Sequence, residues 1–482
     1  MSFQQKVVKG VLWTSIQNWG SQALFFVTFL VLARLLGPET FGLVSLSTIF
    51  IHLIQALLGQ GFSDAIIQRK DLDREHLDTA FWANFGIGLF LFILGVISAP
   101  AIALAFKQPD LIPIVRWMSL LVVFNSVNTT QQAILRREMN FKALAARQLA
   151  GQLAGTIVAI TLALMNFGVW SLVCQQLVTS IVGTLLLWKI TRWRPKLKFS
   201  VKHFRDLYRF GINVVGINIL TFLNVRGDDL LIGYFLGPVA LGYYTVAYKM
   251  LVTLTQLLTD TIRQVVLPSF SRLQNDLEKM RRAFYTATEL VGFVTLPAFL
   301  GMAVLAPELV LGLFGDQWQP SIPVMQCLAF VGVARALVNF TGAVIMAMGK
   351  PSWSLMLSLS DTLVRIIAFA IAVQWGIVAV AIALVISTYL FAPIRLVVVN
   401  QLIPLDFLTY CKQFIPPLLG SGVMVVSLLT AKQFLNLTLN AQFLLGLYIL
   451  IGALAYGLTT AIGAPDLTQR LLKLARIAGP LA

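Results

Sequence analysis

The sequence predicts an all-α integral membrane protein with about fourteen transmembrane helices. Its composition, the length of its apolar spans and an internal repeat support this fold class. Hydrophobic residues make up 58% of the 482 residues and charged residues only 12%, whereas a soluble domain carries about 25% charged residues. The spans lack the strict alternation of an outer-membrane barrel, so we expect helices that cross a bilayer.

Each predicted span holds roughly the 17–25 apolar residues that a bilayer requires. The first span is too long for the apolar core of a signal peptide, so we expect it to remain as a membrane helix. Residues 307–318 are expected to form a short interfacial segment. The predicted spans are 11–35, 41–62, 80–106, 112–135, 143–165, 168–189, 208–236, 239–267, 284–306, 321–347, 352–374, 376–399, 413–431 and 441–462.

The repeat lies at an offset of 200 residues. The segment ARLLGPETFGLVSLS, from Ala33, aligns with GYFLGPVALGYYTVA, from Gly233. The two segments share the pattern Leu-Gly-Pro-x-x-x-Gly, and Asn18 matches Asn218 at the same offset. The chain is therefore interpreted as a duplication.

The repeat predicts two lobes. Spans one and seven are an even number of crossings apart, so both copies enter the membrane in the same direction. We therefore expect two six-helix lobes related by a pseudo-two-fold axis along the membrane normal. The predicted domains are an N-lobe at 1–200, a C-lobe at 201–400, and two further spans with a basic cytoplasmic tail at 401–482.

The basic residues predict the orientation. With both termini in the cytoplasm, most of the 36 Lys and Arg residues lie on the cytoplasmic side, as the positive-inside rule requires. They concentrate between Lys189 and Arg209 and again between Arg263 and Arg282. The net charge of +16 thus indicates loops facing anionic headgroups, and no nucleic-acid partner is expected.

The sequence predicts no enzyme, cofactor or metal site. Three scattered cysteines, Cys174, Cys327 and Cys411, suggest neither a disulfide framework nor a metal site. The chain has no phosphate-binding GxxxxGK[ST] loop and no HExxH motif. Energy for any transport is therefore expected from ion gradients, the membrane potential or downstream consumption.

Several segments together resemble one known family. They are LARLLGPETFGLVSL, AILRREMNFKAL from Ala133, DDLLIGYFLGPVALGYYTVAYKM, LPSFSRLQND and LFGDQW. In this order and spacing they look like the Wzx-type polysaccharide flippases of the multidrug/oligosaccharidyl-lipid/polysaccharide exporter superfamily. The likeness is strongest to the branch that serves exopolysaccharides such as colanic and teichuronic acids, and it covers nearly the whole chain.

The resemblance implies a function and a location. It implies transfer of undecaprenyl-pyrophosphate-linked oligosaccharide units from the cytoplasmic to the outer leaflet of the bacterial inner membrane. Both termini would then be cytoplasmic, and the partners would be the lipid-linked glycan and membrane lipids. The polymerase and chain-length proteins of the same pathway are further candidate partners.

Four cations within spans are candidates for binding such a substrate: Arg226, Lys249, Arg335 and Arg365. A charge at the centre of a membrane helix costs roughly 2.5–3.5 kcal/mol on insertion scales, so it indicates function by default. Arginine grips a phosphate through two hydrogen bonds and lysine acts as a point charge. The alternative is structural pairing, of Arg226 with Asp229 or of Arg365 with Asp361.

Uncharged polar residues complete the predicted binding site. Asn18 and Gln22 share a face of the first span, and Asn218 lies on the matching span of the second copy. Tyr248 belongs to a tyrosine cluster that could stack on sugar rings. The alternatives are hydrogen bonds between helices for the amides and packing for the tyrosines.

Three acids within the predicted spans are candidates for ion coupling: Asp228, Asp229 and Asp361. Asp228 and Asp229 are adjacent, and only the second copy of the repeat carries them. Asp229 is favoured as a protonation gate because it can reach Arg226.

Two other classes of function stay open. A cation-coupled drug exporter or a lipid II flippase would have the same fold. A membrane-embedded polymerase or ligase would be expected to carry a large outer loop, and the predicted spans leave no room for one.

Overall fold

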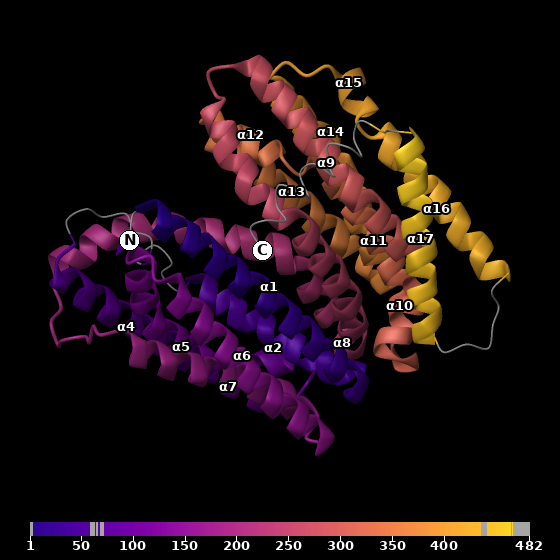
Figure 1. Cartoon of the computed structure of the whole chain (residues 1–482). Coiled ribbons are helices and arrows are strands. Elements are labelled where there is room, and N and C mark those ends of the chain that lie inside the picture. Colours follow the sequence, from indigo (N-terminus) through magenta and orange to yellow (C-terminus); the bar gives the residue numbers. More distant parts are fainter. Residues whose placement is uncertain are drawn as a thin grey trace. The chain divides into compact units, whose positions relative to one another are not determined.

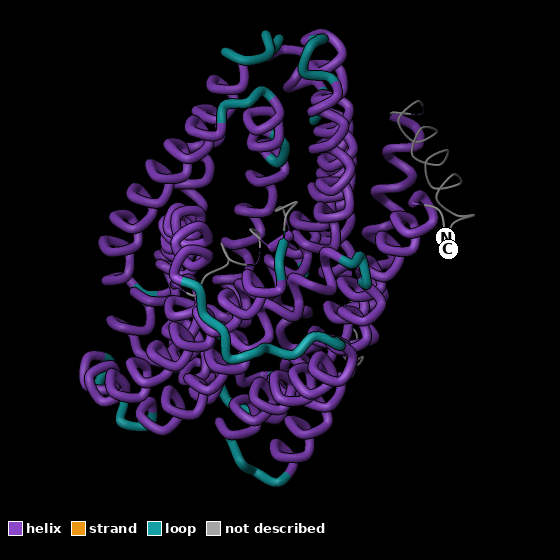
Figure 2. The backbone as a smooth tube through the Cα atoms, turned by 90° about the vertical axis from the view of Figure 1, so that its left-hand side faces the viewer, coloured by secondary structure: helices purple, strands orange, loops and turns teal. Residues whose placement is uncertain are grey.

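A computed structural model of the chain describes residues 3–57, 63, 66–67, 72–434, 441–463 and 465. Throughout these residues the regular structure is helical, and no strand occurs among them (Figures 1 and 2). Thirteen helical segments of this described part are long and apolar enough to cross a membrane. The all-α membrane fold is therefore confirmed.

The longest of these segments accounts for two crossings. It runs from Asn218 to Thr259, 42 residues, within the long helix α8 (Val201–Arg272). The helix breaks at Gly237, where φ is 83° and ψ is 179°. A positive φ suits glycine because it has no Cβ to clash with the backbone. The break separates the two predicted spans 208–236 and 239–267, which gives fourteen spans.

The chain divides into two compact units, Met1–Thr245 and Val246–Ala482. In the first unit, α4 packs on α5, α6 packs on α7, and α1 packs on α6. Its helices are α1 (Phe3–Leu35), α2 (Pro38–Leu57), α4 (Arg74–Ala105), α5 (Leu111–Arg137), α6 (Phe141–Leu164), α7 (Val169–Ile190) and the first part of α8.

Small residues let the helices of the first unit approach closely. A Cβ on Gly88 of α4 would lie 2.4 Å from the Ser126 side chain of α5. A Cβ on Gly151 of α6 would lie 2.7 Å from the backbone oxygen of Thr179 in α7. Without a strong hydrophobic force between helices in lipid, such close van der Waals packing holds a bundle together.

In the second unit, α9 and α14 both pack on α11, α13 packs on α14, and α16 packs on α9 and α17. Its helices are α9 (Leu277–Val304), α10 (Ala306–Leu309), α11 (Ser321–Val338), α12 (Thr341–Ala347), α13 (Pro351–Ala372), α14 (Ile377–Asn400), α15 (Phe407–Lys412), α16 (Ile415–Phe434) and α17 (Ala441–Gly463). Residues 246–272 of α8 also belong to this unit.

Three segments of the second unit depart from a single uninterrupted membrane-spanning helix. The predicted span 321–347 is two helices, because the chain turns at Asn339 and Phe340 between α11 and α12. Residues 306–318 form short helical turns, and they bury Phe314 and Trp318 completely. Pro416 and Pro417 lie in the first turn of α16, where proline is tolerated because those N–H groups have no partner within the helix.

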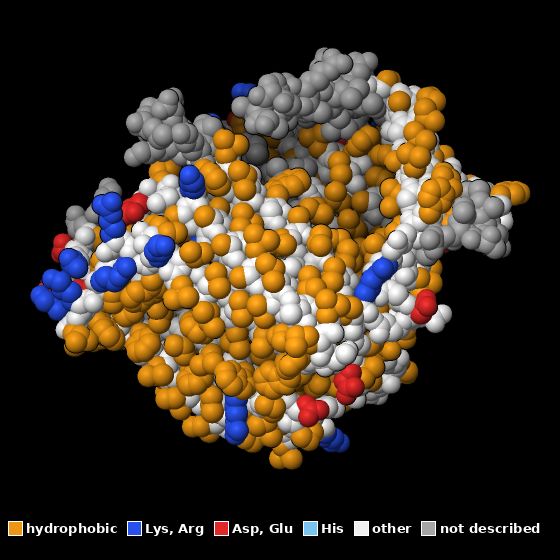
Figure 3. Space-filling model, turned by 60° about the horizontal axis from the view of Figure 1, so that its bottom comes forward, with side chains coloured by type: hydrophobic (Ala, Val, Ile, Leu, Met, Phe, Trp, Pro, Cys, Tyr) orange, Lys and Arg blue, Asp and Glu red, His pale blue; other side chains and the backbone are white. Residues whose placement is uncertain are grey.

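Many hydrophobic side chains are exposed on the surface of the protein. Ile97 is 70% exposed and Leu104 is 81% exposed, both on α4. Figure 3 shows hydrophobic side chains over most of the face in view, with Lys and Arg gathered toward its edges. In a membrane protein, lipid tails cover such side chains.

The two copies of the Leu-Gly-Pro-x-x-x-Gly motif contact each other reciprocally within the first unit. A Cβ on Gly42 would lie 1.7 Å from the carbonyl oxygen of Pro238, and a Cβ on Gly242 would lie 2.0 Å from that of Pro38. Ser45 and Thr245, also 200 residues apart, share a hydrogen bond of 3.2 Å. The last glycine of each motif is therefore needed because the other copy's backbone occupies the space of a side chain.

This contact predicts a graded effect of three alanine substitutions. Gly42→Ala and Gly242→Ala should each destabilise the protein by about 1–3 kcal/mol or more, because a backbone carbonyl cannot move aside as a side chain can. Gly37→Ala is the matched control, since nothing lies within 4 Å of its Cβ position. Thermal unfolding in detergent measures the order. Equal stability of all three variants would contradict the reciprocal contact.

Candidate functional site

The first polar group lies on α8, about two to three helical turns before the break at Gly237. Arg226 Nη1 donates a hydrogen bond of 2.9 Å to Asp229 Oδ2. The Asp229 side chain is 5% exposed and the Arg226 side chain 32% exposed. The predicted ion pair between Arg226 and Asp229 is therefore present. The guanidinium group of Arg226 is still partly accessible.

Asp228 joins the two segments of α8 across the break. Its Oδ2 accepts a hydrogen bond of 2.7 Å from the Tyr244 hydroxyl, and its Oδ1 accepts one of 2.9 Å from the backbone N–H of Asp229. Asp228 is 4% exposed and Tyr244 is fully buried. Since Tyr244 lies beyond Gly237, this bond holds the second segment against the first.

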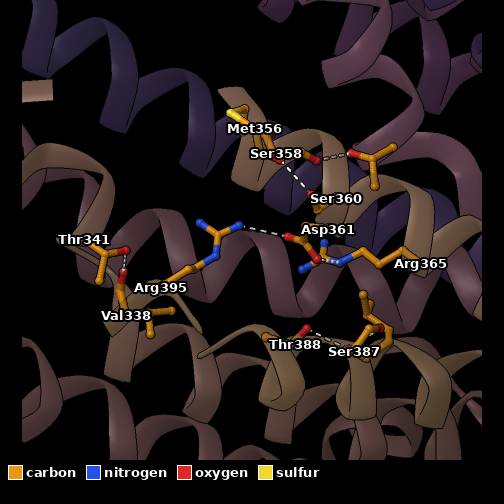
Figure 4. A network of polar contacts seen from close by, with 12 residues as sticks. Val338, Thr341, Met356, Ser358, Ser360, Asp361, Arg365, Ser387, Thr388 and Arg395 are labelled. Carbon is orange, nitrogen blue, oxygen red and sulfur yellow. Dashed lines mark hydrogen bonds and ion pairs between the residues drawn. The ribbon is translucent and has the colours of Figure 1, made fainter. Parts of the chain in front are cut away.

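The second polar group lies on α13 and α14, in the other unit. Asp361 Oδ2 accepts a hydrogen bond of 2.9 Å from Arg395, and Asp361 Oδ1 lies 2.8 Å from Arg365 Nε. Figure 4 shows the two guanidinium groups on opposite sides of the carboxylate. The contact with Arg365 is an ion pair without hydrogen-bond geometry. The predicted pair Asp361–Arg365 is thus confirmed and enlarged by Arg395.

Arg335 adds a third guanidinium to this group. Arg335 and Tyr248 lie close enough to act electrostatically on Arg365. Within the described parts of the chain Arg335 makes no ion pair, and its side chain is half-buried. We call Arg335, Arg365, Arg395 and Asp361 the cationic cluster, whose formal charge is +2 from three arginines and one aspartate.

Arg395 was not among the predicted site residues. Its position within the apolar segment 377–400 is a signal that sequence reasoning could have used. Its partner lies 34 residues earlier on another helix. Helical spacing indicates pairs three or four residues apart, and a pair between helices leaves no such pattern.

The polar residues of α1 serve mainly to join helices. Gln17 donates a hydrogen bond of 2.5 Å to Gln148 of α6, and Gln152 donates one of 2.9 Å to the backbone oxygen of Ser21. Thr28 and Thr156 share a further bond of 2.8 Å. Hydrogen bonds between helices therefore occupy the face of α1 that carries Gln17, Ser21 and Thr28. Asn18 and Gln22 lie about 100° further around the helix.

The structure places the predicted site residues in both units. Tyr248 and Arg335 lie near Arg365 and Asp361, and Lys249 directly follows Tyr248. Asn18 is exposed on α1, Gln22 is half-buried one turn later, and Asn218 is half-buried on α8. The residues of the first unit are Asn18, Gln22, Asn218, Arg226, Asp228 and Asp229, and those of the second are Tyr248, Lys249, Arg335, Asp361 and Arg365.

The cationic cluster predicts that Asp361 stabilises the second unit. Asp361→Asn would leave two guanidinium groups without a counter-charge, and breaking a buried ion pair costs about 3–5 kcal/mol. Arg395→Gln should cost less, because Arg395 is 29% exposed and the pair with Arg365 remains. Chemical unfolding in detergent compares the variants. An Asp361→Asn variant as stable as the parent would show that the ion pairs contribute nothing.

Comparison with known proteins places the chain in a family. Residues 31–323 match the family described as "Polysaccharide biosynthesis protein". The lipopolysaccharide biosynthesis protein WzxC of Escherichia coli (strain K12) is 30% identical over 78% of this chain and 76% of its own length. The teichuronic acid biosynthesis protein TuaB of Bacillus subtilis (strain 168) is 25% identical over 99% of both chains.

Solved structures share the fold at low sequence identity. The inward closed lipid II flippase MurJ has a TM-score of 0.77 and 17% identity over 95% of this chain and all of its own. An inward-facing multidrug resistance MATE family transporter has a TM-score of 0.65 and 19% identity over 82% of this chain and 98% of its own. The resemblance read from the sequence is confirmed: the chain belongs to the family described as "Polysaccharide biosynthesis protein".

Proposed function

We propose that the protein is a flippase for polyprenyl-pyrophosphate-linked oligosaccharide repeat units. It moves them from the cytoplasmic to the outer leaflet of a bacterial inner membrane by alternating access of two lobes. Relatives named for lipopolysaccharide, teichuronic acid and succinoglycan biosynthesis support a glycan pathway. The fold shared with a lipid II flippase supports transfer of a lipid-linked sugar.

The excess positive charge of the cationic cluster carries the proposal. Asp361 balances one arginine, and two positive charges remain among side chains that are buried at Arg365 and half-buried at Arg335 and Arg395. Uncompensated charge in an apolar span is costly, so an anionic ligand would stabilise this arrangement. A pyrophosphate group supplies two or more negative charges and the oxygen acceptors that guanidinium groups prefer.

The rest of the substrate would be met by neutral groups. A sugar hydroxyl placed in hydrocarbon without a partner costs roughly 2–7 kcal/mol, so the glycan needs polar neighbours. We assign this role to Tyr248 beside the cluster. Asn18, Gln22 and Asn218 are further candidates for polar contact with a glycan, within the first unit. The polyprenyl tail can stay in lipid. Arg226 and Lys249 are further candidates for phosphate contact.

The membrane potential can drive outward transfer. It is worth about 2.3 kcal/mol per charge per 100 mV, so two negative charges gain roughly 4–5 kcal/mol on leaving a negative interior. The empty cationic carrier must then return. We propose that protonation of Asp229 gates that step, since Arg226 is its partner. Asp228 and Asp361 are weaker candidates, because their hydrogen bonds and ion pairs hold the fold.

A reconstituted transfer assay tests the proposed function. Vesicles would carry the purified protein and a fluorescent polyprenyl-pyrophosphate sugar, at a clamped potential and pH gradient. Arg335→Gln should slow transfer about tenfold or more, because a lost hydrogen bond to a charged group costs about 1.5–3 kcal/mol. Arg335 lies outside the Asp361 ion pairs, so the fold should be retained.

Two further variants make this experiment specific. Arg34→Gln removes a cation elsewhere and should transfer at the parental rate. Asp229→Asn should keep one-way transfer while losing its response to the pH gradient. Parental transfer by Arg335→Gln would place the phosphate site elsewhere. Transfer of cationic drugs without any transfer of the lipid-linked sugar would favour the drug exporter that shares this fold.

We also propose that both termini and the segment after α7 lie in the cytoplasm. The concentration of Lys and Arg between Lys189 and Arg209 supports this orientation. Lys196 is exposed there, while its backbone N–H donates to Asp78 and its carbonyl accepts from Trp82. A cysteine replacing Lys196 should react with an impermeant thiol reagent only in opened cells. Labelling of this cysteine from outside intact cells would show that the protein has the opposite orientation.

A further inference from the structure

A three-helix junction in the first unit brings α5, α6 and α7 together near one end. Leu135 of α5, Leu144 of α6 and Leu187 of α7 pack in one buried cluster there. The same end carries the exposed cation Arg136 at the end of α5. The cluster fixes which faces of the three helices meet, and so which residues face one another one turn further along.

One turn further along the helices, that contact becomes polar. Arg147 follows Leu144 by three residues on α6, and its Nη1 lies 4.0 Å from the Cβ position of Gly183 on α7. Next to Gly183, Thr184 accepts a hydrogen bond of 2.8 Å from Asn128 of α5. The missing side chain at Gly183 leaves room for the guanidinium.

Gln131 completes this group, which we call the polar junction: Asn128, Gln131, Arg147 and Thr184. Gln131 lies three residues after Asn128 and four before Leu135, so all three share one face of α5. Asn128 contacts α7 and Leu135 packs with α6 and α7. Gln131 therefore faces the same contact region between them.

The polar junction has unused hydrogen-bonding capacity. Gln131 is fully buried, yet neither its amide nitrogen nor its amide oxygen has a partner among the described residues. Asn128 is 3% exposed and its Oδ1 has no partner there, and Arg147 Nε is likewise buried and unbonded. Each buried polar group left unbonded costs free energy, so several in one place favour the binding of a polar ligand there.

The charge of the junction indicates an anion. Arg147 forms no ion pair with a carboxylate in the described ranges, and the charged group that acts on it is another cation, Arg136. The free donors are Arg147 Nε and the Gln131 amide nitrogen. The free amide oxygens of Asn128 and Gln131 could accept from a hydroxyl or a water beside the anion.

We propose that the polar junction binds a phosphate group. The guanidinium of Arg147 matches phosphate geometry, and the Gln131 amide adds a neutral donor. Arg136 is exposed in the last turn of α5, five residues after Gln131, where its charge would attract an anion. The phosphate can come from the headgroup of an anionic lipid or from free inorganic phosphate.

The depth of Arg147 suits either source. It lies six residues after Phe141, where α6 begins, which is about 9 Å along the helix axis. Its side chain is half-buried, so part of it stays accessible. That depth corresponds to the boundary between headgroups and acyl chains, which an arginine side chain reaches by extending along its helix.

A thermal unfolding experiment on the purified full-length protein in neutral detergent tests the proposal. Sodium phosphate would be titrated against sodium chloride at equal ionic strength. Separately, micelles would be doped with phosphatidylglycerol or with diacylglycerol of the same chains. A ligand of the folded state raises the unfolding midpoint in a saturable manner. A rise with sodium phosphate identifies the free anion, and a rise only with phosphatidylglycerol identifies the headgroup.

Variants then locate the site. Arg147→Gln should weaken the apparent affinity about tenfold or more. Gln131→Glu has nearly the same shape and supplies an internal carboxylate for Arg147, so it should fold and lose the phosphate response. Arg192→Gln removes an exposed cation just after α7 and should keep the parental response.

Two results would overturn the proposal. In one, no phosphate compound raises the midpoint above the chloride and diacylglycerol controls. In the other, Gln131→Glu or a folded Arg147→Gln responds to phosphate as the parent does. If Arg147→Gln does not fold, Gln131→Glu alone decides.

Discussion

The cost of placing charge in hydrocarbon governs the polar structure of this protein. Asp361 lies between two arginines, Asp229 pairs with Arg226, and Asp228 accepts from Tyr244. Each of these carboxylates therefore has its counter-charge or donor within its own unit. Such bonds fix helices that lipid would otherwise hold only by packing, because a separated charge has no water to take the partner's place.

Local spacing made part of this predictable. The fold class, the spans, and the pairs Arg226–Asp229 and Asp361–Arg365 all follow from patterns within one helix, where residues three or four apart are neighbours. Three other features do not follow from such local patterns. They are the pair of Asp361 with Arg395, the hydrogen bond from Tyr244 to Asp228 and the turn at Asn339. Each depends on how separate segments pack, and a single sequence carries no periodic signal for that.

The duplication shows the same limit. Gly37 and Gly237 occupy equivalent places in the two motifs, yet only Gly237 has a positive φ. The first copy divides into two helices, α1 and α2, while the second turns within α8. The later glycines, Gly42 and Gly242, do behave alike, because each faces the other copy's proline carbonyl. The repeated motif therefore packs in the same way at its last glycine in both copies, whereas the backbone conformation at its first glycine differs between the copies.

The group on α8 and the cationic cluster differ in charge balance, and this bears on the proposed transport. The group on α8 has one arginine for two aspartates, whereas the cationic cluster has three arginines for one aspartate. An anion added to the cationic cluster reduces a buried excess of positive charge, so binding relieves a cost that the empty protein bears. Under the proposed function, the same excess would oppose the return of the empty carrier, so the carrier would need a separate means of resetting. The proposal assigns this step to Asp229, because the group on α8 holds two titratable carboxylates for one arginine.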